Sequence, residues 1–319
     1  TFDPNVEGAI TREEVLSELS TVVSGCYEQR LVEETITPVA RSVRADFTRD
    51  AYLAAVNRIK DYIAAGDIYQ ANLTQRFRVD ARDLDYWTLY KRLMRTNPTP
   101  FAAYLLFDGV TVISASPERF LQVRGRHVET RPIKGTIRRG DSEMEDEALR
   151  RWLLASEKNR AELAMIVDLM RNDLGRVCRA GSIAVEQFPQ LETYASLHHL
   201  VATVTGELQP GKTVIDVVLA AFPGGSITGA PKIRAMQIIE ELEPVPRGLY
   251  TGSIAYLGFN GNADLNIVIR TIVIQNGTAS LQTGGGIVAD SVDTDEYEES
   301  LVKIRPLLTA LCGTDRPLH

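Results

Sequence analysis

Apolar residues recur at helical spacing in two parts of the chain. One run contains Leu53, Val56, Ile59 and Ile63. This spacing predicts an amphipathic helix with one buried face. A second helical pattern covers residues 145–171 and predicts a single long helix.

Capping boxes mark two expected helix starts. Thr11 and Glu14 have the required spacing, and so do Asp293 and Glu296. The second box predicts a terminal helix that ends near Leu311.

Other segments have the composition of strands joined by tight turns. Residues 101–107 and 110–115 flank Asp108-Gly109, which predicts a hairpin. Three later segments, separated by Asn260-Gly261 and Asn276-Gly277, predict a three-stranded antiparallel meander: residues 250–259, 264–275 and 278–282. Antiparallel hairpins interrupted by helices indicate an α+β protein rather than a doubly wound parallel sheet.

The expected strand 264–275 is apolar on both faces, so it should be buried. Arg270 lies within it, and a buried guanidinium requires an anion because an unpaired buried charge is costly. The anion is either a carboxylate of the protein, in an internal salt bridge, or a carboxylate of a substrate.

Two glycine-rich segments could present backbone N–H groups to an anion. Residues 283–287 contain Gly284, Gly285 and Gly286 after an expected strand. Residues 222–232 resemble a phosphate loop but lack the Lys and Ser or Thr of a Walker A motif. Each segment could equally be only a bulge or a turn.

Carboxylates recur at helical spacing in two places. Glu296 and Glu299 share one face of the terminal helix, with Lys303 four residues further on. Glu162 lies at the margin of an apolar stripe in the long helical pattern. Such residues are usually only a solvated face, but converging carboxylates would suit a hard cation such as Mg²⁺.

Composition narrows the class of protein. The 319 residues carry a net charge of −7, which gives no basic footprint for nucleic acid. The longest apolar stretches, such as residues 214–222, are about half the length that crosses a bilayer. Three scattered cysteines and four histidines show no metal or redox spacing. These features predict a soluble cytoplasmic protein with one main domain.

Six long segments resemble the chorismate-utilising enzymes, a family that includes anthranilate, isochorismate, salicylate and aminodeoxychorismate synthases. The segments are DIYQANLTQRF (67–77), SPERF (116–120), RPIKGT (131–136), AELAMIVDLMRNDLGRV (161–177), FPGGSITGAPK (222–232) and GGGIVADS (284–291). The resemblance implies a large α/β sandwich of two antiparallel sheets with outer helices.

Two positions select a branch of the family. Members that add water carry a lysine where Gln70 stands, so this chain resembles the branches that add ammonia. Anthranilate synthases usually read PIAGT, whereas this chain reads PIKGT around Lys134. The lysine resembles the nucleophile of aminodeoxychorismate synthase component I, which implies amination of chorismate at C4 to 4-amino-4-deoxychorismate, a step toward p-aminobenzoate and folate.

The resemblance also implies roles for individual residues. Glu118 would be the general acid for the departing 4-hydroxyl, and His199 would lie beside the bound C1 carboxylate. The substrate would contact Arg270, Tyr250, Gln70, Thr228, Lys303 and Gly284 to Gly286. Mg²⁺ would bind Glu162, Glu296 and Glu299.

Two further expectations concern domains and partners. Residues 1–45 would be the end of a longer N-terminal region, and residues 46–319 the chorismate-binding domain. No cysteine has the setting of a glutamine-hydrolysing nucleophile, so a separate glutaminase subunit would supply ammonia. The alternatives are anthranilate synthase component I and a catalytically silent chorismate-binding subunit.

Overall fold

The computed structural model describes residues 17, 20, 41–193 and 197–313. The chain divides into two units, Thr1–Pro38 and Val39–His319. The capping box expected at Thr11 and Glu14 lies outside the described residues. The expected domain boundary after residue 45 stays a prediction.

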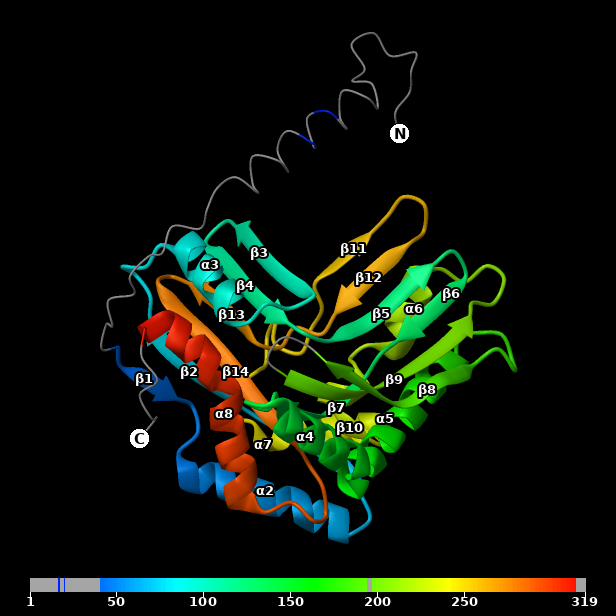
Figure 1. The fold of residues 1–319 in the computed structure, drawn as a ribbon, viewed down its shortest axis with the longest axis horizontal. Helices are drawn as coiled ribbons and strands as arrows, with labels where there is room; N and C mark the ends of the chain where they lie inside the picture. Colours follow the sequence, from blue (N-terminus) through cyan, green and yellow to red (C-terminus); the bar gives the residue numbers. More distant parts are fainter. Residues whose placement is uncertain (1–16, 18–19, 21–40, 194–196, 314–319) are drawn as a thin grey trace. The chain divides into compact units, whose positions relative to one another are not determined.

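Strands of the second unit form two antiparallel sheets, which confirms the predicted fold class (Figure 1). Sheet A has the order β1-β2-β14-β13-β4-β3, with β10 also paired to β2. Its strands are β1 (Val43–Ala45), β2 (Gln70–Asp80), β3 (Phe101–Phe107), β4 (Val110–Ser116), β10 (Gly229–Ala230), β13 (Thr271–Gln275) and β14 (Thr278–Ile287). The hairpin predicted at Asp108-Gly109 is confirmed as β3 and β4.

Sheet B has the order β11-β12-β5-β6-β9-β7, with β8 also paired to β9. Its strands are β5 (Arg119–Arg124), β6 (His127–Thr130), β7 (Ile133–Arg138), β8 (Ala184–Thr193), β9 (Leu197–Glu207), β11 (Ala255–Leu257) and β12 (Ala263–Asn266). In Figure 1 this sheet lies to the right of sheet A.

Helices cover the sheets and bury their apolar residues. Helices packed with sheet A are α2 (Arg49–Ala64), α3 (Tyr86–Thr96), α7 (Lys232–Leu242) and α8 (Asp293–Cys312). Those packed with sheet B or with one another beside it are α4 (Glu143–Ala155), α5 (Glu157–Gly175) and α6 (Val214–Ala221). A short 3₁₀ turn, η1 (Gly225–Ile227), precedes β10.

The predicted single helix over residues 145–171 is wrong, because it is two helices that meet at Ser156. This residue has an extended backbone, with φ of −66° and ψ of 105°, and its hydroxyl accepts from the N–H of Asn159 at 3.3 Å. Ser156 therefore ends α4 and caps α5. Helical periodicity continues across the break because both helices keep an apolar face.

The predicted three-stranded meander is also wrong in its middle strand. Residues 264–275 form two strands in different sheets, because β12 pairs with β5 in sheet B and β13 pairs with β4 in sheet A. Between them Arg270 has a φ of 49°, which turns the chain out of one sheet and toward the other. The Asn276-Gly277 turn is confirmed, with positive φ at both residues.

A second segment crosses between the sheets at the same place. Strand β4 of sheet A ends at Ser116 and β5 of sheet B begins at Arg119. The N–H of Ile267 donates to the carbonyl of Glu118 at 3.0 Å, and the hydroxyl of Ser116 donates to the carbonyl of Ile267 at 2.6 Å. We call these two crossing segments, residues 117–118 and 267–270, the seam.

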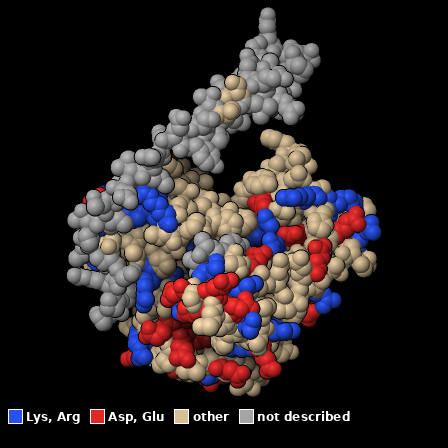
Figure 2. Space-filling model, in the orientation of Figure 1, with Lys and Arg blue, Asp and Glu red and all other residues tan. Residues whose placement is uncertain are grey.

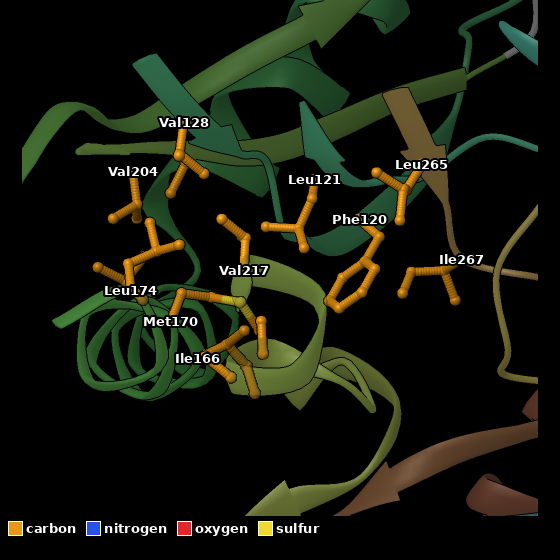
Figure 3. Close-up of a cluster of buried hydrophobic side chains, with 14 of the residues drawn as sticks. Phe120, Leu121, Val128, Ile166, Met170, Leu174, Val204, Val217, Leu265 and Ile267 are labelled. Carbon is orange, nitrogen blue, oxygen red and sulfur yellow. The ribbon is translucent and has the colours of Figure 1, made fainter. Parts of the chain in front are cut away.

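Each sheet has a hydrophobic core of its own. Figure 3 shows the core of sheet B, in which Phe120 and Leu121 of β5 lie near Met170 of α5 and Val217 of α6. The core of sheet A joins β4, β13 and β14 to α3 and α8. A third cluster packs α2 and α7 against β2 and β14.

The capping box predicted at Asp293 and Glu296 does not form. Helix α8 is confirmed, but its N-cap is Val292, which has no side-chain cap. The carboxylate of Glu296 instead accepts from the hydroxyl of Ser291 at 2.6 Å, which holds this side chain in a buried position.

Gly206 of β9 tests the packing of the sheet B core. A Cβ on Gly206 would stand 2.7 Å from the Sγ atom of Cys178. We expect Gly206→Ala to lower the free energy of unfolding by about 1–3 kcal/mol, measured by chemical denaturation. Gly175→Ala is the control, because its Cβ would meet Ile183 at an ordinary 3.6 Å. If Cys178→Ala fails to recover stability in the Gly206→Ala protein, overpacking is not the cause.

Candidate active site

Glu118 lies on the seam, and its side chain is buried. Its Oε1 atom accepts a hydrogen bond from Ser226 Oγ at 2.7 Å. Burial raises the pKa of Glu118 to about 7, although the bond from Ser226 and the charge of Lys134 both oppose the rise. A carboxyl group with this pKa can hold a proton near neutral pH and donate it.

Lys134 lies on β7, one residue before a bulge. The bulge forms at Gly135, whose φ is 77°, and the register of β7 on β9 shifts there. Burial lowers the pKa of Lys134, while the carboxylates of Glu162 and Glu118 oppose this change. The amine therefore loses its proton more readily than a surface lysine does.

Arg270 forms no salt bridge with any of the described residues. Its side chain is partly buried, and burial lowers the pKa of its guanidinium. The interpretation of Arg270 as half of an internal salt bridge is thus wrong for the described part of the chain. A cation held without a protein anion indicates a site for an anionic ligand.

His199 lies on β9 and is buried. Its Nδ1 atom is 2.7 Å from Thr136 Oγ1 on the neighbouring strand β7. Burial lowers the pKa of His199 to about 4, and the charge of Arg270 adds to this effect. The imidazole is therefore neutral at pH 7 and can exchange hydrogen bonds without adding charge to the site.

Gly284, Gly285 and Gly286 lie within β14, so the prediction of a loop there is wrong. They pair with Thr74, Leu73 and Asn72 of β2. A Cβ on Gly285 would stand 3.1 Å from Glu296 Oε2, 3.7 Å from Lys303 Nζ and 3.8 Å from Glu299 Oε1. Glycine leaves this space open beside three charged groups of α8.

The charged groups above Gly285 act on one another. Lys303 Nζ pairs with Glu299 Oε1 at 2.6 Å and donates to the carbonyl of Gly284 at 3.0 Å. Burial raises the pKa of Glu296. Burial also opposes ionisation of Glu299, but the charge of Lys303 and its hydrogen bond outweigh it, so the pKa of Glu299 is lowered.

Carboxylate oxygens are the ligands that Mg²⁺ prefers. Glu296 and Glu299 approach one point above Gly285, and Glu162 of α5 acts on Lys134 from nearby. Across the described ranges, no three acidic, histidine or cysteine side chains stand close enough to hold an ion together. The donor type fits Mg²⁺, and the set of three ligands stays a prediction.

Three more predicted residues lie in or beside this region. Gln70 is fully buried, and its Oε1 atom has no hydrogen-bond partner in the part of the chain that the structure describes. Burial raises the pKa of Tyr250, so its phenol stays protonated and can donate. The hydroxyl of Thr228 donates to the carbonyl of Gly224 at 3.0 Å, which fixes the turn rather than leaving that proton for a ligand.

Ser226 is a functional residue that the sequence did not reveal. It belongs to the glycine-rich segment 222–232, but its partner Glu118 lies 108 residues away. The Glu243–Arg247 pair was also missed. Arg247 Nη2 donates to Glu243 Oε1 at 2.6 Å and to the carbonyl of Asn72 at 3.0 Å. The i,i+4 spacing of Glu243 and Arg247 could have indicated the pair, but no local signal indicates the contact with Asn72.

Two cavities lie beside the candidate site rather than within it. One, of about 520 Å³, is lined by α7 and residues 244–247 and reaches Thr228. The other, of about 880 Å³, lies along α4. Neither cavity is lined by Lys134, Glu118 or Arg270. The candidate site is therefore located by these charged residues and not by a cavity.

Comparison with known proteins shows which family the chain resembles. The model of the chorismate binding enzyme family matches residues 6–309. Aminodeoxychorismate synthase component 1 of Bacillus subtilis (strain 168) is 49% identical over 272 residues, which are 85% of this chain and 58% of that protein. Anthranilate synthase component 1 of the same strain is 43% identical over 309 residues, or 95% and 60% of the two chains.

A solved structure shares the fold. Anthranilate synthase component I from Streptococcus pneumoniae TIGR4 is similar with a TM-score of 0.79 at 34% identity, over 93% of this chain and 66% of that one. This chain thus spans 58% and 60% of the length of the two Bacillus relatives.

The surface and the helices add two further observations. On the face in Figure 2, Lys and Arg side chains are interspersed with Asp and Glu side chains, so this face carries no broad basic surface.

Among the described residues, every helix is too short or too polar to cross a membrane.

Arg270 and Arg247 should differ in their effect on stability. Arg247→Gln leaves Glu243 buried without its cation, so we expect it to lose about 3–5 kcal/mol of unfolding free energy. Arg270→Gln removes a cation that has no protein anion among the described residues. We expect the free energy of unfolding, measured in urea, to change by less than about 1 kcal/mol. The same variant should lose about 2–5 kcal/mol of chorismate binding, measured by calorimetry. Equal destabilisation by both variants would contradict this assignment.

Proposed function

The chain belongs to the chorismate binding enzyme family, and from that premise we propose that it aminates chorismate at C4. The product would be 4-amino-4-deoxychorismate. Both an aminodeoxychorismate synthase and an anthranilate synthase are close relatives, so family membership alone does not select the reaction.

Lys134 is the residue that favours amination at C4 over attack of ammonia at C2. It is a partly buried amine on β7, its pKa is lowered by burial, and the charge of Glu118 acts on it. A neutral amine is the form that attacks carbon, so this environment favours covalent catalysis. Without such an amine, ammonia would attack C2 directly and give the anthranilate-type product.

The proposed reaction has two displacement steps. Lys134 Nζ forms a bond to C2 as the C4–O bond breaks, and Glu118 gives its proton to the departing hydroxyl, which leaves as water. Ammonia then attacks C4, the ring double bond returns, and the Nζ–C2 bond breaks. The incoming nitrogen gives its extra proton to the Glu118 carboxylate, so Glu118 and Lys134 both return to their starting forms.

Other residues would bind and orient the substrate. Arg270, the cation without a protein anion, and the protonated phenol of Tyr250 would hold the enolpyruvyl carboxylate. Lys303 and the open space at Gly285 would receive the ring carboxylate. Neutral His199 would contact this region without repelling Arg270.

Mg²⁺ and a partner subunit complete the proposal. Glu162, Glu296 and Glu299 would hold Mg²⁺, which supplies positive charge for the ring carboxylate. A glutaminase subunit would provide ammonia, as the function of a component 1 relative suggests. Because the chain spans 58% of that relative, the activity of the whole protein belongs to the proposal.

Lys134→Ala tests the reaction directly. The protein is incubated with chorismate, Mg²⁺ and ammonium at alkaline pH, and products are identified by mass and ultraviolet spectrum. We expect wild type to form 4-amino-4-deoxychorismate and Lys134→Ala to lose at least about 100-fold of this activity. Lys212→Ala, at an exposed ion pair, is the control.

A substrate adduct on Lys134 should be found by peptide mapping in wild type and be absent from the alanine variant. Undiminished C4 amination by Lys134→Ala would refute the nucleophile role. Anthranilate from the wild-type chain would instead assign it to anthranilate synthesis.

Removal of Mg²⁺ should abolish turnover, because Glu296 and Glu299 would then repel one another and the substrate dianion. The assay compares protein with excess EDTA and the same sample after Mg²⁺ is restored. Full activity in EDTA would exclude the metal from the proposal.

A further inference from the structure

One side chain holds both ends of the loop that carries Ser226. The loop runs from Phe222 to Pro231, between α6 and α7. Ala221 directly precedes the loop and Lys232 directly follows it. Lys232 Nζ donates a hydrogen bond to the carbonyl of Ala221 at 2.7 Å. This bond closes the base of the loop.

The same amine joins the loop to α5. Lys232 Nζ pairs with Asp173 Oδ2 at 2.6 Å, and the two side chains are only 12% and 6% exposed. Burial raises the pKa of Asp173, and the bond from Lys232 opposes the rise. Lys232 thus links the ends of three helices, α5, α6 and α7.

The loop has little space in which to move. A Cβ on Gly225 would stand 2.5 Å from Leu169 Cδ2 of α5. The carbonyl of Ser226 accepts from Asn72 Nδ2 at 2.8 Å, while its hydroxyl donates to Glu118 at 2.7 Å. A shift of either loop end would therefore move the donor that contacts Glu118.

A buried ion pair contributes little net stability, because desolvation offsets most of the attraction. An apolar pair could fill the same space. The specific consequence of a lysine here is geometric, since its amine donates to the carbonyl of Ala221 and to the carboxylate of Asp173 together, which an apolar side chain cannot do.

We propose that Lys232 is a positioning residue for catalysis: its bonds to Ala221 and Asp173 fix the loop so that Ser226 donates to Glu118. The inference rests on the proposed function, in which Glu118 is the general acid. Lys232 bonds to Asp173 and to the carbonyl of Ala221, so it acts on Glu118 through the loop.

The direction of the expected pH effect follows from the hydrogen bond. Donation from Ser226 lowers the pKa of Glu118, so loss of this bond raises it. The charged and titratable groups that face Glu118 are Lys134 of β7 and the phenol of Tyr250. Neither is altered by a substitution at Lys232, so the alkaline limb of the kcat profile should move to higher pH.

The experiment compares Lys232→Met, Ser226→Ala and the double variant, with Lys212→Met as a control at an exposed Lys–Asp pair of 3.3 Å. We expect each single variant to lose about 10- to 100-fold in kcat with little change in KM. Both should move the alkaline limb in the same direction. The double variant should be no slower than the slower single variant, because both substitutions remove one function.

A readout without turnover separates this inference from the proposed function. The carboxyl carbon of Glu118, labelled with ¹³C and assigned with Glu118→Gln, is titrated by NMR. Lys232→Met should raise its pKa as Ser226→Ala does, even if the wild-type product is not 4-amino-4-deoxychorismate.

Three results would overturn the inference: an unchanged Glu118 titration in Lys232→Met, additive losses of kcat in the double variant, or a lower melting temperature with an unchanged pH profile. If Lys232→Met does not fold, Asp173→Asn replaces it. That variant keeps the bond to Ala221 and removes only the charge of the partner on α5, which weakens the link to this helix, and the same criteria apply.

Discussion

The site depends on one constraint: two segments must cross between the sheets at the same place. Neither segment can complete a ladder there, so the backbone groups of Glu118 and Ile267 satisfy one another. The seam residues lie where the chain passes from one sheet to the other. Glu118 and Arg270 are therefore placed by the topology of the fold rather than by a loop at its surface.

Burial then gives each group of the candidate site a different protonation state. The same loss of water raises the pKa of Glu118, lowers that of Lys134 and keeps His199 neutral. Arg270 keeps its positive charge although burial lowers the pKa of its guanidinium. An acid, an amine, a neutral imidazole and a fixed cation thus act on one another in one region of the molecule.

The sequence predicted what local signals determine. The Asp108-Gly109 hairpin, the Asn276-Gly277 turn and helices α2 and α8 follow from spacing and turn residues. The break at residues 267–270 does not, because the segment stays apolar while it changes sheets. The prediction that Arg270 needs an anion stays a prediction, and the strand that was expected to hold this residue does not exist.

Residues that act through distant contacts were harder to predict. Gly284 to Gly286 looked like a loop because glycine is rare inside strands, whereas here the lack of side chains keeps space open beside α8. No local sequence pattern indicated a role for Ser226, because its hydrogen bond is to Glu118, which lies far away along the chain. The roles of Lys134 and Glu118 came from family resemblance alone, because a lysine or glutamate in such a segment is usually structural.

The separate cores on either side of the seam have a consequence for cooperativity. One cluster is built on sheet B and another on sheet A, and a chain with two cores can open one of them while the other stays intact. A ligand that contacts groups from both sheets would penalise either partial opening. Occupancy of the seam would then make the two halves unfold as one unit, so amide protons in both should become protected together.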